Sequence, residues 1–223
     1  MANSQSVTPR PPSPITVFIV DDDPSARKGL LWLVRSAGWQ GEVFASAREF
    51  LARPAFSGTG CVILDVNMPG MTGLQLRDLM AERNISLPVV FLTGHGDVPM
   101  SVDAMKKGAV DFLQKPVNDE ALLQAVHHAV ERHAAAQVHR QEVERIQARV
   151  QRLTPRERDV LEYVIGGCLN KQIADALQIA EATVKQHRGL VMQKMEVSSV
   201  PELVRQCETA GIAPRAAAQR GAG

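Results

Sequence analysis

The feature that most constrains the fold is an alternation of short apolar runs with longer helical patterns over residues 15–133. The runs are rich in β-branched or aromatic side chains, as strands are, and lie at residues 16–20, 42–44, 61–64, 89–92 and 111–113. Between them, apolar positions recur every three or four residues, as in amphipathic helices, over residues 26–37, 47–52, 72–83 and 99–107. Several runs are apolar throughout, so both faces of their sheet should be covered. The alternation predicts an α/β domain with a doubly wound, five-stranded parallel sheet.

Local signals mark the ends of some predicted helices. Ser46, with Glu49 three places on, has the spacing of a capping box that opens a helix. Gly38 and Gly108 stand where glycines that end helices are common. These signals place helix ends at the borders of the apolar runs, as the alternation requires.

Acidic residues come at the ends of two predicted strands. Asp21 and Asp22 follow the first strand, and Asp65 ends the third. In open α/β sheets, ligands bind beyond the carboxyl ends of the strands, where the strand order reverses. With the order 2-1-3-4-5, which is that of flavodoxin-like sheets, Asp21 and Asp22 would lie beside Asp65.

Such a group of carboxylates favours a particular chemistry. Crowded carboxylates repel one another, and Mg²⁺ removes that repulsion. Beside the metal, Asp65 can act as a nucleophile towards phosphorus and form an aspartyl phosphate. Lys115, after the fifth run, supplies a positive charge, and Thr93, after the fourth, supplies a hydroxyl group. Taken singly, each of these residues could be a helix cap or a solvated side chain, so only their combination indicates phosphoryl transfer.

Four separated motifs resemble the receiver domain of bacterial two-component response regulators, over residues 15–133. They are Val20-Asp21-Asp22, Leu64-Asp65-Val66-Asn67-Met68-Pro69-Gly70, Thr93-Gly94 and Lys115-Pro116. The resemblance implies that Asp65 accepts a phosphoryl group from a sensor histidine kinase. It also implies that Mg²⁺ is the cofactor, held by Asp22, Asp65 and the backbone carbonyl of Asn67, with support from Asp21.

The same resemblance implies a switch. Lys115 would stabilise the phosphoryl group, and Thr93 and Phe112 would form the pair of residues that responds to it. Phe112 lacks the hydroxyl group of the tyrosine that many relatives have at this position. We therefore expect only the packing part of the switch here.

The other residues that could bind a metal or form a disulfide show no ligand pattern. His95, between two glycines, is expected to be a solvent-facing loop residue. Four further histidines fall along a polar helix without a facing partner set, so we expect no metal role for His127, His128, His133 or His139. The cysteines are odd in number and lack ligand spacing, which indicates reduced thiols at Cys61, Cys168 and Cys207.

A helical pattern runs without proline or glycine from Asn118 to the residue before Pro155. Its first part should be the last helix of the receiver domain, and residues 134–152 should form a linker helix. Heptad-like apolar steps favour contact with another subunit, whereas a solvated connector would show the same short, Ala- and Gln-rich sequence. Both alternatives stay open.

A second domain begins at Thr154, because Thr154, Pro155 and Glu157 have the spacing of a capping box with proline in the first turn. Helices are predicted from there to Ile165, over 170–177, over 181–195 and from Ser199 onward. Residues 182–195 contain three basic residues and no acidic one. We expect Val184, Leu190 or Val191, and Met195 to face the core. The residues expected to face outward are Lys185, Gln186, Arg188 and Gly189. A short helix, a tight turn and a longer helix with basic residues on one side indicate a helix-turn-helix.

Three motifs of this domain resemble the LuxR/FixJ-type DNA-binding domain, over residues 153–211. They are Leu153 to Arg158, Asn170 to Ala174 and Glu181 to Arg188. The resemblance implies that Lys185, Gln186 and Gly189 lie nearest the base edges. It implies further contacts with the phosphate backbone of double-stranded promoter DNA from Lys171, Thr183 and Arg188.

Two residues depart from the pattern of that family. Ala180 stands at a cap position where many relatives have serine, which should cost about 1 kcal/mol of helix stability unless Glu181 compensates. Gly189, inside the recognition helix, has a similar cost and takes the place of a longer polar side chain in many relatives. It could permit close approach to DNA or simply remove a contact.

The chain as a whole therefore resembles a FixJ/LuxR-type response regulator that controls transcription, and not an enzyme apart from its own phosphorylation and dephosphorylation. We expect a homodimer on phosphorylation, a contact with RNA polymerase and a cytoplasmic location without a membrane partner. Two rivals are an enzyme with a catalytic output domain and an adaptor that binds only proteins.

Residues 1–14 and 212–223 are predicted to be disordered tails. Because Lys plus Arg total 25 against 24 Asp plus Glu, net charge by itself indicates no nucleic-acid partner.

Overall fold

The computed structural model describes residues 14–94 and 110–216. The helix expected over residues 99–107, with Gly108, and the loop residue His95 lie outside these ranges, as do residues 1–13 and 217–223 of the predicted tails. The chain divides into two compact units, residues 1–137 and 138–223, which are described separately below.

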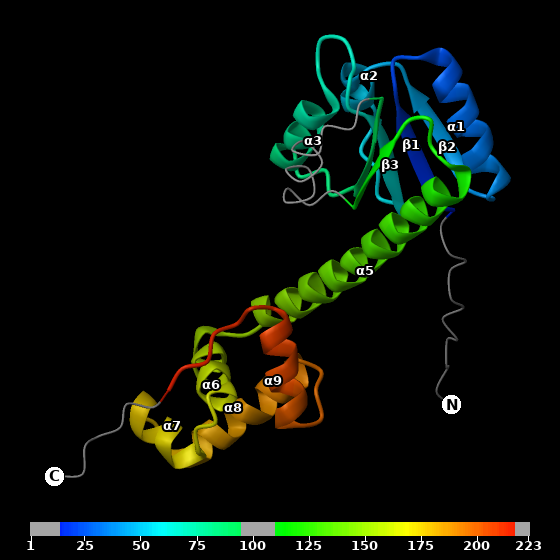
Figure 1. Cartoon of the computed structure of the whole chain (residues 1–223). Coiled ribbons are helices and arrows are strands. Elements are labelled where there is room, and N and C mark those ends of the chain that lie inside the picture. Colours follow the sequence, from blue (N-terminus) through cyan, green and yellow to red (C-terminus); the bar gives the residue numbers. More distant parts are fainter. Residues whose placement is uncertain (1–13, 95–109, 217–223) are drawn as a thin grey trace. The chain divides into compact units, whose positions relative to one another are not determined.

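The first unit contains a five-stranded sheet with helices on both faces (Figure 1). In chain order its elements are β1 (Thr16–Val20), α1 (Pro24–Ser36), β2 (Gln40–Phe44), α2 (Ala47–Ala52), β3 (Gly60–Asp65), α3 (Gly73–Glu82), β4 (Val89–Thr93), β5 (Asp111–Gln114) and the first part of α5 (Asp119–Gln151), which continues into the second unit. The strands lie in the order β2-β1-β3-β4-β5, and every neighbouring pair is parallel. This confirms the predicted doubly wound sheet.

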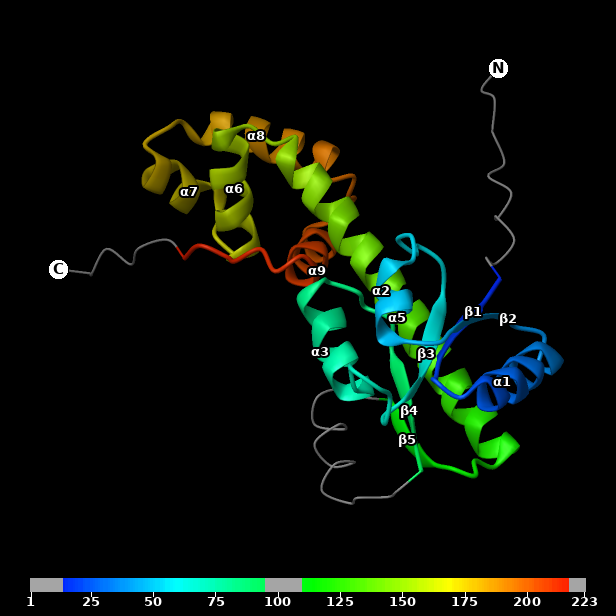
Figure 2. The ribbon, with the colours of Figure 1, turned by 90° about the horizontal axis from the view of Figure 1, so that it is seen from above.

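Alternate residues of the strands enter two separate cores, because successive side chains of a strand point to opposite faces. On one face Phe18, Leu64 and Phe91 pack beneath α2 and α3. On the other face Ile19 and Ile63 pack beneath α1 and the first part of α5. Figure 2 shows these two helix layers on either side of the strands. Burial on both faces explains why the strands are apolar throughout.

The boundaries differ from the sequence patterns where polar residues take part. β2 begins at Gln40, two residues before the predicted start, because its backbone pairs with Thr16 of β1. α1 begins at Pro24, because the Asp23 side chain accepts a hydrogen bond from the Ser25 N–H and caps the helix. The earlier starts of β2 and α1 both depend on hydrogen bonds, which cannot be predicted from the spacing of apolar residues.

Two of the predicted helix-end signals, Gly38 and the pair Ser46 and Glu49, fall on described residues. Gly38, just past the end of α1, has φ of +82°, a conformation that glycine adopts readily. Ser46 caps α2 by accepting a hydrogen bond from the Glu49 N–H. The Glu49 carboxylate reaches back to the N–H of Ala45, not to that of Ser46. The reciprocal bond expected for a capping box is thus displaced by one residue.

The second unit is all-helical. It contains the end of α5 followed by α6 (Pro155–Ile165), α7 (Asn170–Leu177), α8 (Glu181–Lys194) and α9 (Val200–Thr209). Thr154 and Glu157 form the predicted capping box at the start of α6. Ile146 of α5 is buried in the core of this unit and Val150 packs against it. The last turns of the predicted linker helix are therefore part of the second unit and not a fully solvated connector.

The segment that follows α9 contacts α6. The Arg215 N–H donates a hydrogen bond to the Glu162 carbonyl oxygen of α6. Residues 212–215 belong to the predicted tail, and composition alone did not indicate this contact. Among the helices that the structure describes, none is long and apolar enough to cross a membrane.

Candidate functional site

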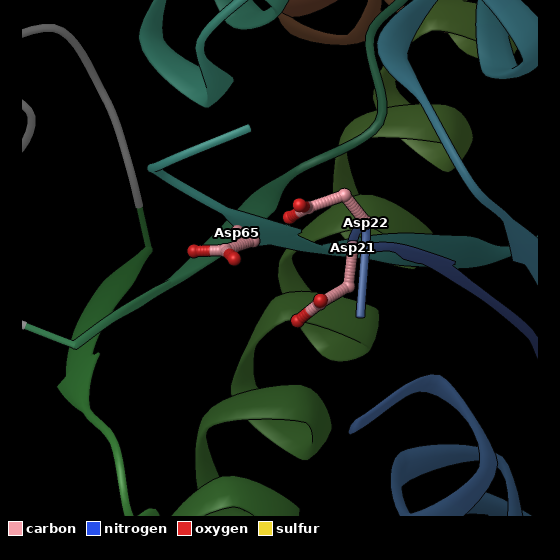
Figure 3. Close-up of side chains that lie close together, drawn as sticks. All are labelled: Asp21, Asp22 and Asp65. Atoms are coloured by element: carbon pink, nitrogen blue, oxygen red, sulfur yellow. The ribbon is translucent and has the colours of Figure 1, made fainter. Parts of the chain in front are cut away.

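Three acidic side chains converge at the carboxyl edge of the sheet (Figure 3). Val20 of β1 pairs with Leu64 of β3, so Asp21 and Asp65, the next residues of the two strands, come side by side. Asp21 is 1% exposed and Asp65 7% exposed, whereas Asp22 is exposed. One carboxylate oxygen from each of the three residues lies within 4.8 Å of the others. The structure thus brings together the acids that the strand order predicted.

Lys115 joins two of these acids. Its Nζ atom donates to Asp21 Oδ2 at 2.7 Å and to Asp65 Oδ2 at 3.0 Å. Burial alone would lower the pKa of Lys115, but the hydrogen bonds and negative charges of Asp21 and Asp65 outweigh it and raise that pKa above its usual value. The ammonium group therefore stays charged and offsets part of the negative charge of the cluster.

Backbone groups fix the orientation of both buried carboxylates. Asp21 Oδ1 accepts from the N–H of Asp23 at 2.8 Å, and Asp65 Oδ1 accepts from the N–H of Asn67 at 3.2 Å. The Arg27 guanidinium of α1 donates to the Asp21 carbonyl oxygen. Arg27 was not among the site residues predicted from the sequence, although its position four residues after the cap Asp23 places it one helical turn from the strand end.

Gly73 allows α3 to begin directly against the end of β3. A Cβ atom at this position would lie 2.3 Å from the Asp65 carbonyl oxygen, which is closer than side-chain carbons approach such atoms. The Gly73 N–H also donates to the Val66 carbonyl oxygen at 2.9 Å. Any larger residue would therefore displace the strand end that carries Asp65.

The two predicted switch residues lie on neighbouring strands. Thr93 ends β4 and is 1% exposed. Phe112 of β5 is half-buried, and its ring centroid lies 6.0 Å from that of Phe91 on β4. The Lys115 N–H donates to the Thr93 carbonyl oxygen at 2.7 Å, so the end of β4 is linked to the residue that contacts the acids.

In the second unit, α7, a turn and α8 form the predicted helix-turn-helix. The core-facing side chains are buried: Val184 and Val191 of α8, and Met195, which caps its C-terminus. Of the two residues that could have faced the core, Leu190 and Val191, it is therefore Val191 that does. Lys185, Gln186 and Gly189 of α8 are exposed on the other side, and Lys171 and the half-buried Thr183 lie at the starts of α7 and α8. A Cβ atom placed on Gly189 would meet no atom within 4 Å in the part of the chain that the structure describes, so no contact there requires a glycine.

Arg188 differs from the expectation of an outward-facing side chain. It is half-buried, and its Nη1 atom donates to Asn170 Oδ1 at 2.9 Å. This bond connects the middle of α8 to the first residue of α7. Ala180 caps α8 without a side-chain hydrogen bond, as expected from its sequence, and Glu181 lies in the first turn.

Lys194 is the third basic residue of the stretch 182–195, and its ammonium group contacts α6. Its Nζ atom lies 2.6 Å from Glu157 Oε2 and 2.9 Å from Oε1, and Glu157 is 3% exposed. Burial would raise the pKa of Glu157, but its bonds with Lys194 and Thr154 outweigh burial and hold that pKa below its usual value. Lys194 therefore stabilises the fold and does not add to the outward basic face.

Histidine and cysteine side chains form no second site among the described residues. The acidic trio is the only group there of three or more His, Cys, Asp or Glu side chains that could hold a metal ion. His133 is buried and its Nδ1 atom accepts from the Gly60 N–H at 3.1 Å, which is a structural contact. Burial raises the pKa of Cys61 to about 12 and that of Cys207 to about 11, so both thiols stay protonated near neutral pH.

Comparison with known proteins agrees with both parts of this description. Residues 17–127 match the response regulator receiver domain, and residues 151–207 match the bacterial regulatory proteins of the luxR family. Nodulation protein W of Bradyrhizobium diazoefficiens is 46% identical over 196 residues, which cover 88% of this chain and 86% of that protein. The transcriptional regulatory protein FixJ of Rhizobium meliloti is 41% identical over 199 residues, which cover 89% of this chain and 98% of that protein.

The solved structure of the response regulator StyR has a TM-score of 0.78 with this chain at 44% sequence identity. The match covers 88% of this chain and 99% of the StyR chain. The match therefore spans both the domain with the sheet and the domain with the helix-turn-helix. The chain belongs to the two-component response regulators that join a receiver domain to a LuxR-family DNA-binding domain and regulate transcription.

Proposed function

We propose that phosphorylation of Asp65 by a sensor histidine kinase controls DNA binding by the second domain. The observation that supports this most directly is the cluster of Asp21, Asp22 and Asp65 with the Lys115 ammonium between two of them. Such a cluster concentrates negative charge around one carboxylate and places a cation where a phosphoryl group would arrive. The enzymatic activity of the chain is then limited to its own phosphorylation and dephosphorylation.

The acidic cluster fits Mg²⁺ as cofactor. Asp21, Asp22 and Asp65 offer carboxylate oxygens, the hard donors that this ion prefers, and the backbone carbonyl of Asn67 would add a fourth oxygen. Lys115 neutralises only part of the charge of the three acids. When bound, the ion supplies positive charge that stabilises the negative oxygens of the transferring phosphoryl group.

In the transfer step, a carboxylate oxygen of Asp65 forms a bond to phosphorus while the bond from phosphorus to the kinase histidine nitrogen breaks. The electron pair of that bond leaves with the imidazole. Lys115 lies 3.0 Å from Asp65 Oδ2 and is charged, so its Nζ can move with little rearrangement to a phosphoryl oxygen. Attack of water on the aspartyl phosphate later returns free Asp65 and inorganic phosphate.

The phosphate adds about 1.5 to 2 negative charges, which shifts the receiver towards a conformation that can contact them. The hydroxyl group of Thr93 donates a hydrogen bond to a phosphate oxygen. Phe112, half-buried beside Phe91, then packs inward behind it. The changed surface favours a homodimer, and two DNA-binding domains on one promoter bind paired half-sites.

On DNA, α8 enters the major groove with Lys185, Gln186 and Gly189 nearest the base edges. Lys171 and Thr183 contact the phosphate backbone. Arg188 keeps its bond to Asn170 and so orients α7, and its remaining N–H groups are available to a phosphate. The bound dimer recruits RNA polymerase, and the protein works in the cytoplasm, where kinase and promoter are both within reach.

Replacing Lys185 with alanine should weaken DNA binding and flatten its dependence on salt. A lysine that neutralises a DNA phosphate displaces a counterion from the DNA. Loss of one such lysine reduces the magnitude of the slope of log affinity against log salt concentration by about 1. Fluorescence anisotropy with a labelled duplex over a range of salt concentrations measures this slope. Lys28→Ala, which removes an exposed lysine from α1, is the matched control and should leave the slope unchanged. A normal slope for Lys185→Ala would count against the contact.

Selection of bound sequences from random DNA, with and without a small phosphodonor and Mg²⁺, tests the proposed function as a whole. We expect paired half-sites that are enriched strongly only after phosphorylation, since the dimer must contact both. Enrichment of single half-sites independent of phosphodonor would contradict the dimer mechanism. Absence of any enriched sequence would favour the adaptor alternative.

A further inference from the structure

The segment after α9 folds back onto α6. We call residues 212–216 the C-terminal arm. In addition to its backbone bond with Glu162, the Arg215 guanidinium lies 3.3 Å from Glu162 Oε2 and 3.5 Å from Asp159 Oδ1. It also lies over the ring of Tyr163, 5.5 Å from the ring centroid. Figure 1 shows this segment, in red, passing α6 on its way from the end of α9.

Gly166, at the end of α6, makes room for the arm. Its φ of −76° is open to any residue, so backbone conformation does not explain the glycine. A Cβ atom there would lie 2.4 Å from the Arg215 carbonyl oxygen and 3.1 Å from the carbonyl carbon. A side chain at residue 166 and the arm in its present position are therefore incompatible.

The arm also contacts the loop that joins α6 to α7, residues 166–169. The Cys168 Sγ atom donates to the Arg215 carbonyl oxygen at 3.9 Å, and this is the same oxygen that a Cβ atom at residue 166 would meet. Two consecutive glycines make this loop costly to order, and contacts with the arm offset that cost. The residue after the loop is Asn170, which accepts the bond from Arg188 of α8.

We propose that Arg215 is a positioning residue for DNA binding: through the C-terminal arm it holds the loop 166–169 and so fixes the N-terminus of α7. That N-terminus carries Lys171, which is exposed. The inference rests on the proposed contact between Lys171 and the phosphate backbone. It goes beyond that contact because Arg215, in the C-terminal arm, packs against α6 and would affect DNA binding only through α7.

The test uses the full-length protein with phosphodonor and Mg²⁺ and a labelled duplex of mixed sequence about two helical turns long. Arg215→Ala releases the arm by removing its ion pairs, and Gly166→Ala displaces it from the opposite side. Each should weaken binding about fivefold and lower the salt slope by about 1, as Lys171→Ala does. Combining Arg215→Ala with Lys171→Ala should add no further loss, because both changes remove the same contact.

Arg205→Ala is the matched control, since it removes an exposed arginine of α9 and should leave affinity and slope unchanged. Circular dichroism selects a temperature at which every variant is folded. Full affinity in Arg215→Ala and Gly166→Ala, or losses that add to that of Lys171→Ala, would overturn the inference. If Lys171→Ala itself leaves the slope unchanged, the proposed Lys171 contact fails. The role of the arm in positioning Lys171 fails with it, whereas a normal loss in Lys171→Ala beside full affinity in both arm variants overturns the arm inference alone.

Discussion

Asp65→Asn is expected to abolish phosphorylation of the protein by a small phosphodonor in the presence of Mg²⁺. The amide keeps the shape of the side chain but is a poor nucleophile towards phosphorus. It also removes one of the three negative charges of the acidic cluster, the one that faces the Lys115 ammonium at 3.0 Å. Intact-mass spectrometry should show one added phosphoryl group on the wild-type protein and none on the variant.

Asp78→Asn provides the control for that measurement. Asp78 is an exposed acid on α3 outside the acidic cluster, and its variant should gain the phosphoryl group as the wild-type protein does. Phosphorylation of Asp65→Asn at the wild-type level would show that another residue is the acceptor. The assignment of Asp65 would then be wrong.

Glu157→Gln should lower the free energy of unfolding of the second unit by about 2 kcal/mol at neutral pH. The variant leaves Lys194 without its partner, and breaking a buried ion pair costs about 3–5 kcal/mol. We expect less because the Lys194 side chain is 32% exposed and can turn to solvent. Urea titration followed by circular dichroism measures the loss. Glu208→Gln, at an exposed site on α9, should change nothing.

The pH dependence of this loss follows from the carboxyl pKa. The pKa of Glu157 is lower in the folded protein than its usual value of 4.5, so its stabilising effect is fully present above pH 4.5. It is lost as the pH falls through the folded-state pKa, because the unfolded chain binds the proton more readily. The difference between wild type and Glu157→Gln should therefore shrink at low pH. A constant difference at every pH would contradict the role of the ion pair.

Sequence patterns predicted the sheet and its acidic edge well because these features are local. Strands buried on both faces must be apolar throughout, and Asp21, Asp22 and Asp65 stand directly at strand ends. The strand order alone then decides which ends meet. The start of β2 at Gln40 was missed, since it depends on pairing with β1 and not on side-chain pattern.

Contacts between distant parts of the chain could not be predicted in the same way. Lys194 was counted only among the basic residues of the stretch 182–195, and its pairing with Glu157, 37 residues away in sequence, could not be read from that stretch. Arg215 looked like a residue of a loose tail, yet α6 supplies two carboxylates, a carbonyl group and an aromatic ring for it. In both cases the partner is specified only by how the helices pack.

The affinity of the full-length protein for a selected promoter duplex, measured with and without phosphodonor in wild type and Asp65→Asn, tests the central claim most directly. We expect phosphodonor to raise the affinity of the wild-type protein between about 5-fold and 150-fold, the usual range for coupling between two sites. The affinity of Asp65→Asn should not respond. An equal response of both proteins, or no response of the wild type once mass spectrometry shows it phosphorylated, would contradict control of DNA binding through Asp65.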